Sequence, residues 1–366
     1  MKIAEVTSHQ VRVNHRGDWV FVRVRTDDGI VGWGEASHSG NDAAVRLAIG
    51  ELAKRAVGRS PFEIEAIVQA GAAAVRGFVS ATAASGLEHA LWDVVGKAAG
   101  QPVRNLIGGP LRDRVRLYAN VNRHVTRREP ASYAAAAAAA VAEGFAAVKC
   151  APFDDVHWTR LGDADGQRAL LVGLERVRAI RRAVGPDVDL LVDCHWRFDV
   201  PTARRVAEEL APERLFWIED PVGQDDPAQL REVKSFLGTR LAGGERLLTR
   251  AGFAALAEAR AVDVVMPDLK HVGGILETRK IAAVAEVHGV AVAPHAPAGP
   301  IASAASAQAC ATLANFLILE HAWGEVDWRA DLIGGERIEG GCRVLGDRPG
   351  LGVDVDERLL ERHRAP

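Results

Sequence analysis

Short apolar runs typical of β-strands recur along the chain, with helical stretches between them. The runs cover residues 116–120, 145–149, 188–193, 215–219, 240–245, 262–266, 290–294 and 315–320. From the third run onward, strand starts recur every 22 to 28 residues, the length of one strand–helix unit in a parallel sheet. Eight such runs favour a closed (β/α) barrel over an open doubly wound sheet. No GxGxxG follows a strand, which disfavours dinucleotide binding.

A different pattern precedes the predicted barrel. Strand-like runs at 3–13, 20–25 and 30–34, with a Thr26-Asp27-Asp28-Gly29 turn before the last, predict an antiparallel meander. Helical spacing follows at 41–56, 62–75 and 79–99. A meander followed by helices indicates an α+β domain.

Composition restricts the partners and the compartment. Lys and Arg total 45 and Asp and Glu total 48, for a net charge of −3, so a dominant basic surface for nucleic acid is excluded. No apolar run approaches the roughly 18 residues of a membrane span, and the first residues lack the apolar core of a signal peptide. The four cysteines show neither a disulfide framework nor zinc spacing. We therefore expect a cytoplasmic protein with no nucleic acid or membrane partner.

Three carboxylates close three consecutive predicted strands. Asp193, Glu219 and Glu245 are separated by 26 residues each. Because the carboxyl ends of barrel strands open into one site, we expect these oxygens to lie within a few ångströms of one another. Three apposed carboxylates cannot all stay ionised without a cation, and an all-oxygen set suits Mg²⁺ rather than zinc. The alternative, that each acid merely caps the following helix, is disfavoured by three acids in phase.

Two histidines follow barrel strands beside acids. His295 comes after the seventh strand and Asp268 after the sixth, so the carboxylate would orient the imidazole and raise its basicity. His195 lies two residues after Asp193, on the same face if the strand persists, and would then lie beside the metal and opposite His295. The alternatives are a structural His295 and a loop His195 without a role.

Lys149 and Glu320 lie at the second and eighth strands. Lys149 could act as a base, attract a substrate carboxylate or pair with Asp193. Glu320 could donate a hydrogen bond to a developing enediolate if protonated, or form a salt bridge to an arginine or to Lys149. Mg²⁺ between a base and an acid suggests removal of a proton next to a carboxylate. A second base on the opposite face would then give racemisation, and a general acid would give loss of water.

These residues, in this order, resemble the enolase superfamily in its mandelate racemase-like branch, and within it the acid-sugar dehydratases of the galactonate type. The likeness covers almost the whole chain, including 31–35, 90–97, 193–195, 242–246, 267–275 and 293–301. It implies an α/β fold, a modified (β/α)7β barrel with an α+β N-terminal capping domain. The expected boundaries are 1–112 for the cap, with its specificity loops, 113–324 for the catalytic barrel, and 325–366 for a segment folding back on the cap.

The resemblance also implies roles. The Mg²⁺ ligands would be Asp193, Glu219 and Glu245. His295, held by Asp268, would remove the proton at C2, and His195 would help the 3-hydroxyl leave. Glu320 matches the strand-eight acid that contacts the substrate carboxylate. The expected reaction converts a galactonate-like aldonate to a 2-keto-3-deoxy sugar acid. The alternative is a racemase, epimerase or cycloisomerase on the same scaffold.

The chain departs from the family pattern at two barrel strands, and other residues are candidates for substrate binding. Many relatives carry Lys-x-Lys at strand 2, where this chain has Lys149 and Ala151, so a racemase using that base is disfavoured. Glu219-Asp220-Pro221 replaces Glu-Glu-Pro and keeps the ligand. The candidates for substrate binding are Arg16, Trp19, Asn122, Arg123, Arg197 and the Arg76-Gly77 region. The family implies a homo-oligomer, with an octamer as one candidate. A non-catalytic binding barrel is disfavoured because neither a metal acid nor the Asp–His pair is lost.

Overall fold

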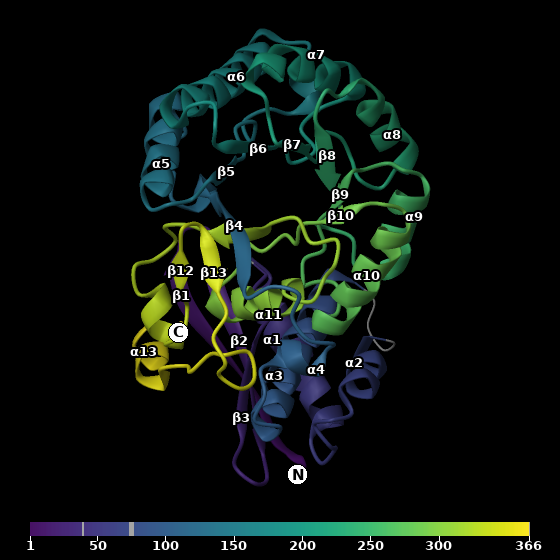
Figure 1. Cartoon of the computed structure of the whole chain (residues 1–366), viewed down its shortest axis with the longest axis vertical. Helices are drawn as coiled ribbons and strands as arrows, with labels where there is room; N and C mark the ends of the chain where they lie inside the picture. Colours follow the sequence, from purple (N-terminus) through teal and green to yellow (C-terminus); the bar gives the residue numbers. More distant parts are fainter. Residues whose placement is uncertain (39, 73–76, 366) are drawn as a thin grey trace.

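The first domain of the structure, a computed structural model that describes residues 1–38, 40–72 and 77–365, is built on an antiparallel sheet. Its strands β1 (Ile3–Asn14), β2 (Gly17–Thr26) and β3 (Val31–Glu35) lie in the order β1-β2-β3. The helices α1 (Asp42–Ala56) and α3 (Phe78–Ala98) pack against this sheet, and α2 (Ile64–Ala72) packs on α3 and α1 (Figure 1). Glycine lets β3 and α3 approach each other closely, because a Cβ on Gly34 of β3 would lie only 2.0 Å from the carbonyl oxygen of Gly86 in α3. The meander and its helices are thus confirmed, although residues 73–75 of the expected helix over 62–75 lie outside the described residues.

The second domain is a ring of eight strands that closes on itself. The strands are β4 (Arg114–Asn120), β5 (Ala147–Cys150), β6 (Asp189–Asp193), β7 (Trp217–Glu219), β8 (Arg240–Gly243), β9 (Val264–Val265), β10 (Ala291–Val292) and β11 (Leu319–Ala322). Each pairs in parallel with the next from β4 to β10, and β11 pairs in parallel with β4. A parallel bridge between Val292 and Phe316 joins β10 to the stretch that leads into β11. The predicted (β/α)7β barrel is therefore confirmed.

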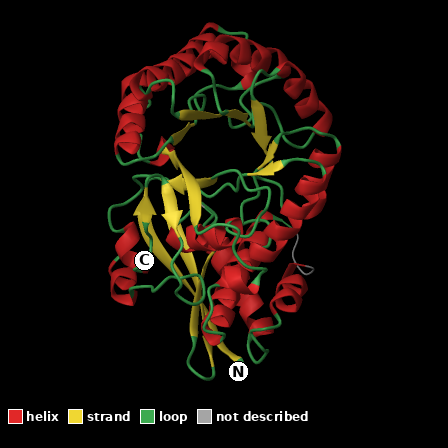
Figure 2. Cartoon of the chain, viewed as in Figure 1, coloured by secondary structure: helices red, strands yellow, loops and turns green. Residues whose placement is uncertain are grey.

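Helices form the outer ring around these strands (Figure 2). They are α5 (Pro130–Ala142), α6 (Ala164–Val184), α7 (Val200–Leu210), α8 (Pro227–Phe236), α9 (Arg250–Glu258), α10 (Ile275–Val287) and α11 (Pro300–Cys310). The side chains of Asp163, Asp199 and Asp226 accept hydrogen bonds from the first turns of α6, α7 and α8, which explains where these helices begin. Inside the ring, large side chains such as Tyr118 and Trp217 fill the barrel, so the centre is a packed core.

The remaining elements lie before, within and after the barrel. The helix α4 (Val103–Leu106) precedes the barrel, and η1 (Val121–Arg123), η2 (Trp158–Arg160) and η3 (Ala211–Glu213) are single 3₁₀ turns. The last segment contains α12 (Arg329–Ile333), β12 (Ile338–Glu339), β13 (Cys342–Val344) and α13 (Glu357–Arg362). Arg364 bridges Val11 of the first sheet, whereas β13 pairs antiparallel with β4. The segment therefore contacts the barrel as well as the first domain.

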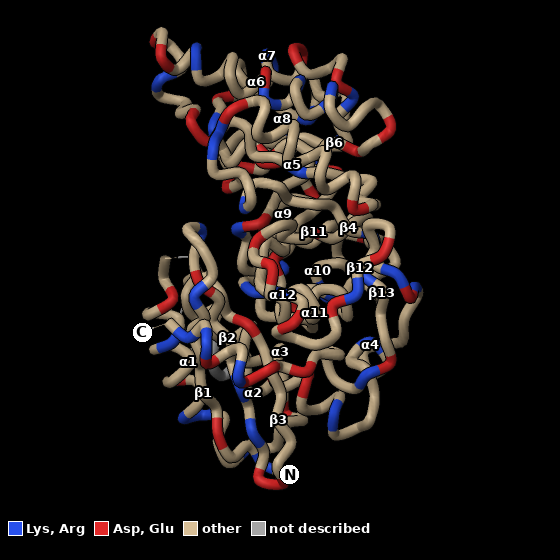
Figure 3. Tube along the Cα trace, turned by 90° about the vertical axis from the view of Figure 1, so that its left-hand side faces the viewer, with Lys and Arg blue, Asp and Glu red and all other residues tan. Residues whose placement is uncertain are grey.

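Charged residues of both signs are interspersed over both domains (Figure 3). Among the helices that the structure describes, none has the length and hydropathy that a bilayer crossing requires.

Candidate active site

The three predicted metal acids converge at the carboxyl ends of neighbouring barrel strands. Asp193 ends β6 and Glu219 ends β7, and the two residues are paired in the ladder. Glu245 lies two residues beyond the end of β8, because that strand stops at Gly243 rather than at 245 as expected. One carboxylate oxygen from each acid lies within 4.8 Å of the others, which is close enough to share one ion. The convergence expected from the 26-residue spacing is confirmed.

Lys149 of β5 lies buried against this cluster. Its Nζ is 2.9 Å from Glu219 Oε1, 3.1 Å from Glu320 Oε1 and 3.7 Å from Asp193 Oδ2. Of the three alternatives for Lys149, the structure shows an ion pair, made more closely with Glu219 and Glu320 than with Asp193. Burial lowers the pKa of Lys149, but the carboxylates of Glu219 and Glu320 outweigh it and raise the pKa well above its usual value. Lys149 therefore carries a charge here and does not offer a free base.

Glu320 is fixed from both sides of its carboxylate. Asn120 Nδ2 donates to Oε1 at 2.6 Å and the Ala296 amide donates to Oε2 at 2.9 Å. Burial raises the pKa of Glu320, but Lys149 and His295 lower it below its usual value overall. Of the two alternatives, the structure thus shows the salt bridge to Lys149. It opposes the protonated form that donation to an enediolate would require.

His295 and Asp268 form the expected pair across neighbouring strands. Asp268 follows β9, His295 follows β10, and His295 Nδ1 lies 2.8 Å from Asp268 Oδ2. His295 Nε2 lies 3.1 Å from Glu245 Oε2 and 3.9 Å from Glu320 Oε2, so it faces the acid cluster. Burial lowers the pKa of His295, but Glu245, Glu320 and Asp268 together raise it to about 9.

His195 contacts Asp193 of the cluster, but a continuing strand, as the sequence pattern suggests, does not bring it there. β6 ends at Asp193, and His195 has a φ of 46°, so the strand does not persist as assumed. A tight turn, in which the His195 amide donates to Asp193 Oδ1 at 3.0 Å, returns the ring so that Nε2 lies 3.0 Å from Asp193 Oδ2. Burial lowers the pKa of His195, but Asp193 and Asp154 raise it to about 11.

Two residues at this site are absent from the sequence-based candidates. Asp154, in the loop after β5, places Oδ1 2.5 Å from His195 Nδ1. Lys270 Nζ lies 2.9 Å from Asp268 Oδ2, so Asp268 is held by a cation as well as by His295. Asp154 follows a strand end by four residues in an irregular loop, and no periodic signal marks such a position.

A cavity of about 170 Å³ lies over His295 between the two domains. The first domain contributes Asp18, Trp19, Ser37 and His38, and the barrel contributes Arg123, Lys270, His271, His295 and residues 297–299. The walls are mainly polar or charged, and they combine residues more than 250 positions apart in the chain. The described residues that line it include His295 but neither His195 nor a metal acid, so the cavity can take a small polar molecule beside His295.

Comparison with known proteins assigns the family. Residues 3–108 match the family described as "Mandelate racemase / muconate lactonizing enzyme, N-terminal domain", and residues 132–359 match "Enolase C-terminal domain-like". The chain belongs to the enolase superfamily. The D-galactonate dehydratase of Ralstonia pickettii (strain 12J) is 35% identical over 370 residues, covering 98% of this chain and 94% of that protein. The D-xylonate dehydratase of Haloferax volcanii is 35% identical over 374 residues, covering 98% and 89%.

Solved structures agree with this assignment. A mandelate racemase/muconate lactonizing enzyme from a Sulfitobacter species has a TM-score of 0.90 and 33% identity, covering 99% of this chain and 95% of that one. This enolase superfamily member resembles the galactonate dehydratases over its full length and is an enzyme of the hydro-lyase class.

The acid cluster of this enolase superfamily chain fits a divalent cation. Burial and the neighbouring Asp193 raise the pKa of Glu219 well above its usual value. For Asp193, burial opposes ionisation, but His195 and Lys149 hold its pKa below its usual value. Buried carboxylates that raise the pKa of one another need added positive charge to ionise together, and a divalent cation on oxygen ligands would supply it.

The expected substrate-binding residues separate into two kinds. Trp19 lines the cavity, and Arg16, half-buried in the β1–β2 turn, has its pKa lowered by burial and by the nearby Arg123. Arg197 is half-buried just beyond His195, and its Nε has no hydrogen-bond partner among the described residues. Asn122, by contrast, is buried and uses Oδ1 to accept from the Ala151 amide at 2.7 Å, so it holds the loop after β5. Arg76 lies outside the described residues, and Gly77 borders another cavity.

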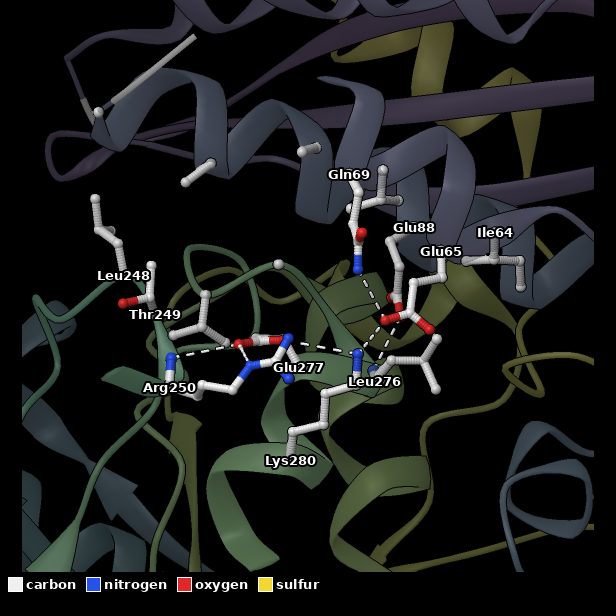
Figure 4. Close-up of a pocket in the computed structure, with 16 residues that line it drawn as sticks. Ile64, Glu65, Gln69, Glu88, Leu248, Thr249, Arg250, Leu276, Glu277 and Lys280 are labelled. Atoms are coloured by element: carbon white, nitrogen blue, oxygen red, sulfur yellow. Dashed lines mark hydrogen bonds and ion pairs between the residues drawn. The ribbon is translucent and has the colours of Figure 1, made fainter. Parts of the chain in front are cut away.

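That other cavity, of about 480 Å³, lies between α2, α3 and α10 (Figure 4). Glu65 and Gln69 of the cap face Lys280 of α10 across it, and Glu277 pairs with Arg250. The described residues that line it include neither histidine of the site nor any metal acid. Its walls are largely apolar, Glu65 and Glu277 are paired with Lys280 and Arg250, and Glu88 accepts from the first amides of α10.

Proposed function

We propose that this enzyme dehydrates an acid sugar, a galactonate-like aldonate of five or six carbons, with Mg²⁺ as cofactor, to a 2-keto-3-deoxy sugar acid. The observation that carries the proposal is an acid cluster contacted by two histidines, His295 at Glu245 and His195 at Asp193. The full-length similarity to D-galactonate and D-xylonate dehydratases supports the substrate class.

The residues that would hold Mg²⁺ are Asp193, Glu219 and Glu245. When bound, the cation supplies positive charge next to the substrate carboxylate, which makes the hydrogen at C2 more acidic. Lys149 and Glu320 lie beside the cluster and position the carboxylate end of the substrate. Lys149 offsets part of the negative charge that these acids bring together.

His295 removes the proton at C2. Asp268 accepts the Nδ1–H of its ring, so Nε2 is the atom whose lone pair takes the proton when the ring is in its neutral form. Because Nε2 also faces Glu245 and Glu320, the imidazolium formed in this step lies next to carboxylates that stabilise it.

His195 then donates a proton to the 3-hydroxyl. The electron pair from the broken C2–H bond forms a C2–C3 double bond, the C3–O bond breaks, and the hydroxyl leaves as water with the proton from His195. The resulting enol takes up a proton at C3 and becomes the 2-keto-3-deoxy acid. Arg16, Trp19 and Arg197 would contact the distal hydroxyls, while Asn122 would act indirectly by holding the loop after β5.

The test is incubation with a panel of aldonates and Mg²⁺, with detection of 2-keto acids. We expect His295→Asn to abolish both deuterium exchange at C2 in D₂O and dehydration, a loss of about 10³-fold or more. His195→Asn should suppress water loss while sparing exchange. The proposal fails if no aldonate is turned over although Mg²⁺ binds, and exchange without water loss in the wild type would identify an epimerase or racemase instead.

We also propose that the enzyme works in the cytoplasm as a homo-oligomer. Light scattering coupled to size exclusion checks the assembly, with a mass of several 39.1 kDa chains expected and a monomer as the contrary result.

A further inference from the structure

The loop after β5 places a carboxylate behind His195. Asp154 Oδ1 lies 2.5 Å from His195 Nδ1, and its Oδ2 lies 3.2 Å from Arg128 Nη1. The Asp154 side chain is only 19% exposed. Both of its oxygens are therefore engaged, one by the imidazole and one by a guanidinium.

This loop is held in place by several independent contacts. Arg128 Nη2 donates to the Ala151 carbonyl at 2.7 Å, and its guanidinium lies over the Tyr133 ring. The buried Arg176 donates to the Pro152 carbonyl at 2.7 Å. Phe153 packs edge-on against Phe198 and presses on α6 at a glycine, where a Cβ on Gly173 would meet its ring at 2.3 Å. The three residues that precede Asp154 are thus held in place by hydrogen bonds and packing.

We propose that Asp154 is a positioning residue for His195: it accepts the Nδ1–H and directs Nε2 to the acid cluster and the substrate. This inference rests on the proposed function, in which His195 delivers a proton to the 3-hydroxyl. The geometry matches the other histidine of the site, because Asp268 accepts from His295 Nδ1 in the same way. Two Asp–His pairs then face the same acid cluster. Asp268 supports His295, the proposed base, next to Glu245, and Asp154 supports His195, the proposed acid, next to Asp193.

The pairing has a chemical purpose. The ring can rotate about its Cβ–Cγ bond, and without a partner on Nδ1 either nitrogen could face the substrate. Asp154 removes this ambiguity, since Nδ1 is occupied and Nε2 lies 3.0 Å from Asp193 Oδ2. The proton that leaves for the 3-hydroxyl must then come from Nε2, the atom on the substrate side. Partners of this kind typically change activity by about 10- to 100-fold when removed.

The loop supplies a matched control. Asp155 lies next to Asp154 and pairs with Arg176 at 2.6 Å and with Arg128 at 3.4 Å, so it holds the same loop through one of the same partners. The structure records no contact between Asp155 and His195 among the described residues. A role in folding the loop predicts similar losses for both acids, whereas positioning of His195 predicts a loss for Asp154 alone.

The experiment measures dehydration and C2 deuterium exchange of D154A, D154N and D155N with Mg²⁺ and the aldonate that the wild type turns over. We expect D154A to lower kcat for dehydration about 100-fold with KM changed by only about 2-fold, while exchange, performed by His295, persists. D154N keeps an oxygen that accepts from Nδ1–H, so its loss should be nearer 10-fold. D155N should stay within about 2-fold of the wild type.

Equal losses in D154A and D155N, or a parallel fall of exchange and dehydration in D154A, would overturn the inference. Crystal structures of both variants give a readout that does not depend on turnover: the His195 ring should leave its position in D154A and keep it in D155N. An unmoved ring in D154A would also overturn it. If the wild type turns over no aldonate, the proposed function fails, and the ring position still decides whether Asp154 orients His195.

Discussion

Two groups of carboxylates in this enzyme, each largely shielded from solvent, have different partners: one group faces ionisable side chains, and the other accepts from backbone amides. One group, Asp193, Glu219 and Glu245, lies at the barrel mouth with its oxygens directed toward one another. The other group, the boundary acids Glu35, Glu88 and Asp93, comes from the cap: Glu35 and Glu88 accept from backbone amides of the barrel, and Asp93 accepts from the Leu351 amide of the last segment and pairs with Lys97. Burial alone therefore does not distinguish a candidate metal acid from a structural one. The groups that the carboxylate faces make this distinction.

The boundary acids are satisfied by the protein itself. Glu35 accepts from the Gly299 and Ala302 amides at 2.7 and 2.8 Å, and so caps the first turn of α11. Glu88 does the same for α10 through two backbone amides. The amides that begin a helix have no partner within it and carry partial positive charge, so they can replace the water that a buried carboxylate loses.

The acids at the mouth face ionisable side chains rather than the first amides of a helix. Lys149, His195 and His295 supply positive charge at their edges, while the three carboxylates face one another and repel when ionised. A divalent cation would have the required charge and ligand preference. We therefore expect that neutralising an acid at the mouth lowers mainly Mg²⁺ affinity and activity, whereas removing a boundary acid lowers mainly the stability of the fold.

The largest expected effect comes from Glu245→Gln. The amide keeps the shape of the side chain but removes a charge that the cation needs, so Mg²⁺ affinity should fall about 100-fold and dehydration about 10³-fold. The thermal midpoint without metal should change little, because neutralising one of three apposed carboxylates also relieves repulsion. Calorimetric titration with Mg²⁺, the keto-acid assay and thermal unfolding with a chelator measure the three quantities. If the thermal unfolding midpoint measured without metal falls strongly and the Mg²⁺ affinity stays unchanged, Glu245 has a structural role like that of the boundary acids.

Much of this distinction could be predicted from the sequence, and the reason is geometric. Parallel strands end at one edge of a barrel, so equal spacing was enough to bring Asp193, Glu219 and Glu245 together and to pair Asp268 with His295. Periodicity defines which residues follow a strand, and barrel topology converts that position into proximity.

The rest depended on local conformation that periodicity does not encode. His195 reaches the cluster through a residue with positive φ, not through a continuing strand. Asp154 lies in an irregular loop, and Asn122 turns its amide to a backbone group of that loop. The sequence likewise gave no sign that Glu35 reaches α11, since that contact joins residues 267 positions apart.

The second effect in size concerns Glu35→Ala at the cap boundary. The change leaves the first amides of α11 without their acceptor in a buried place, which should lower the free energy of unfolding by about 4 kcal/mol. Mg²⁺ affinity should stay within about 3-fold, because Glu35 does not belong to the acid cluster. Urea unfolding and calorimetric titration measure the two. Glu65→Gln is the control, since its half-exposed pair with Lys280 should contribute no more than about 0.5 kcal/mol. A Glu35 variant that loses metal affinity and keeps its stability would reverse the assignment.

The smallest effect is a pH dependence that belongs to the boundary group. Burial raises the pKa of Glu88 to about 7 from an ordinary value near 4.5, although the Leu276 and Ile275 amides lower it. Between these values the folded protein holds a proton that the unfolded chain has released, so the free energy of unfolding falls as pH rises through this interval.

Because Glu88→Gln cannot titrate, the variant should lose this pH-dependent part of the stability, which amounts to at most about 3.5 kcal/mol at about 1.4 kcal/mol per pH unit. Urea unfolding at about pH 5 and about pH 8 measures the difference in wild type and variant. Glu65→Gln tests the sign, because Lys280 lowers the pKa of Glu65 and so adds stability that is lost as pH falls, an effect kept small by solvent. An equal pH response in the wild type and in the Glu88 variant would show that helix-end amides compensate this carboxylate fully when it is ionised. The boundary acids would then differ from the mouth acids even more sharply than their pKa values indicate.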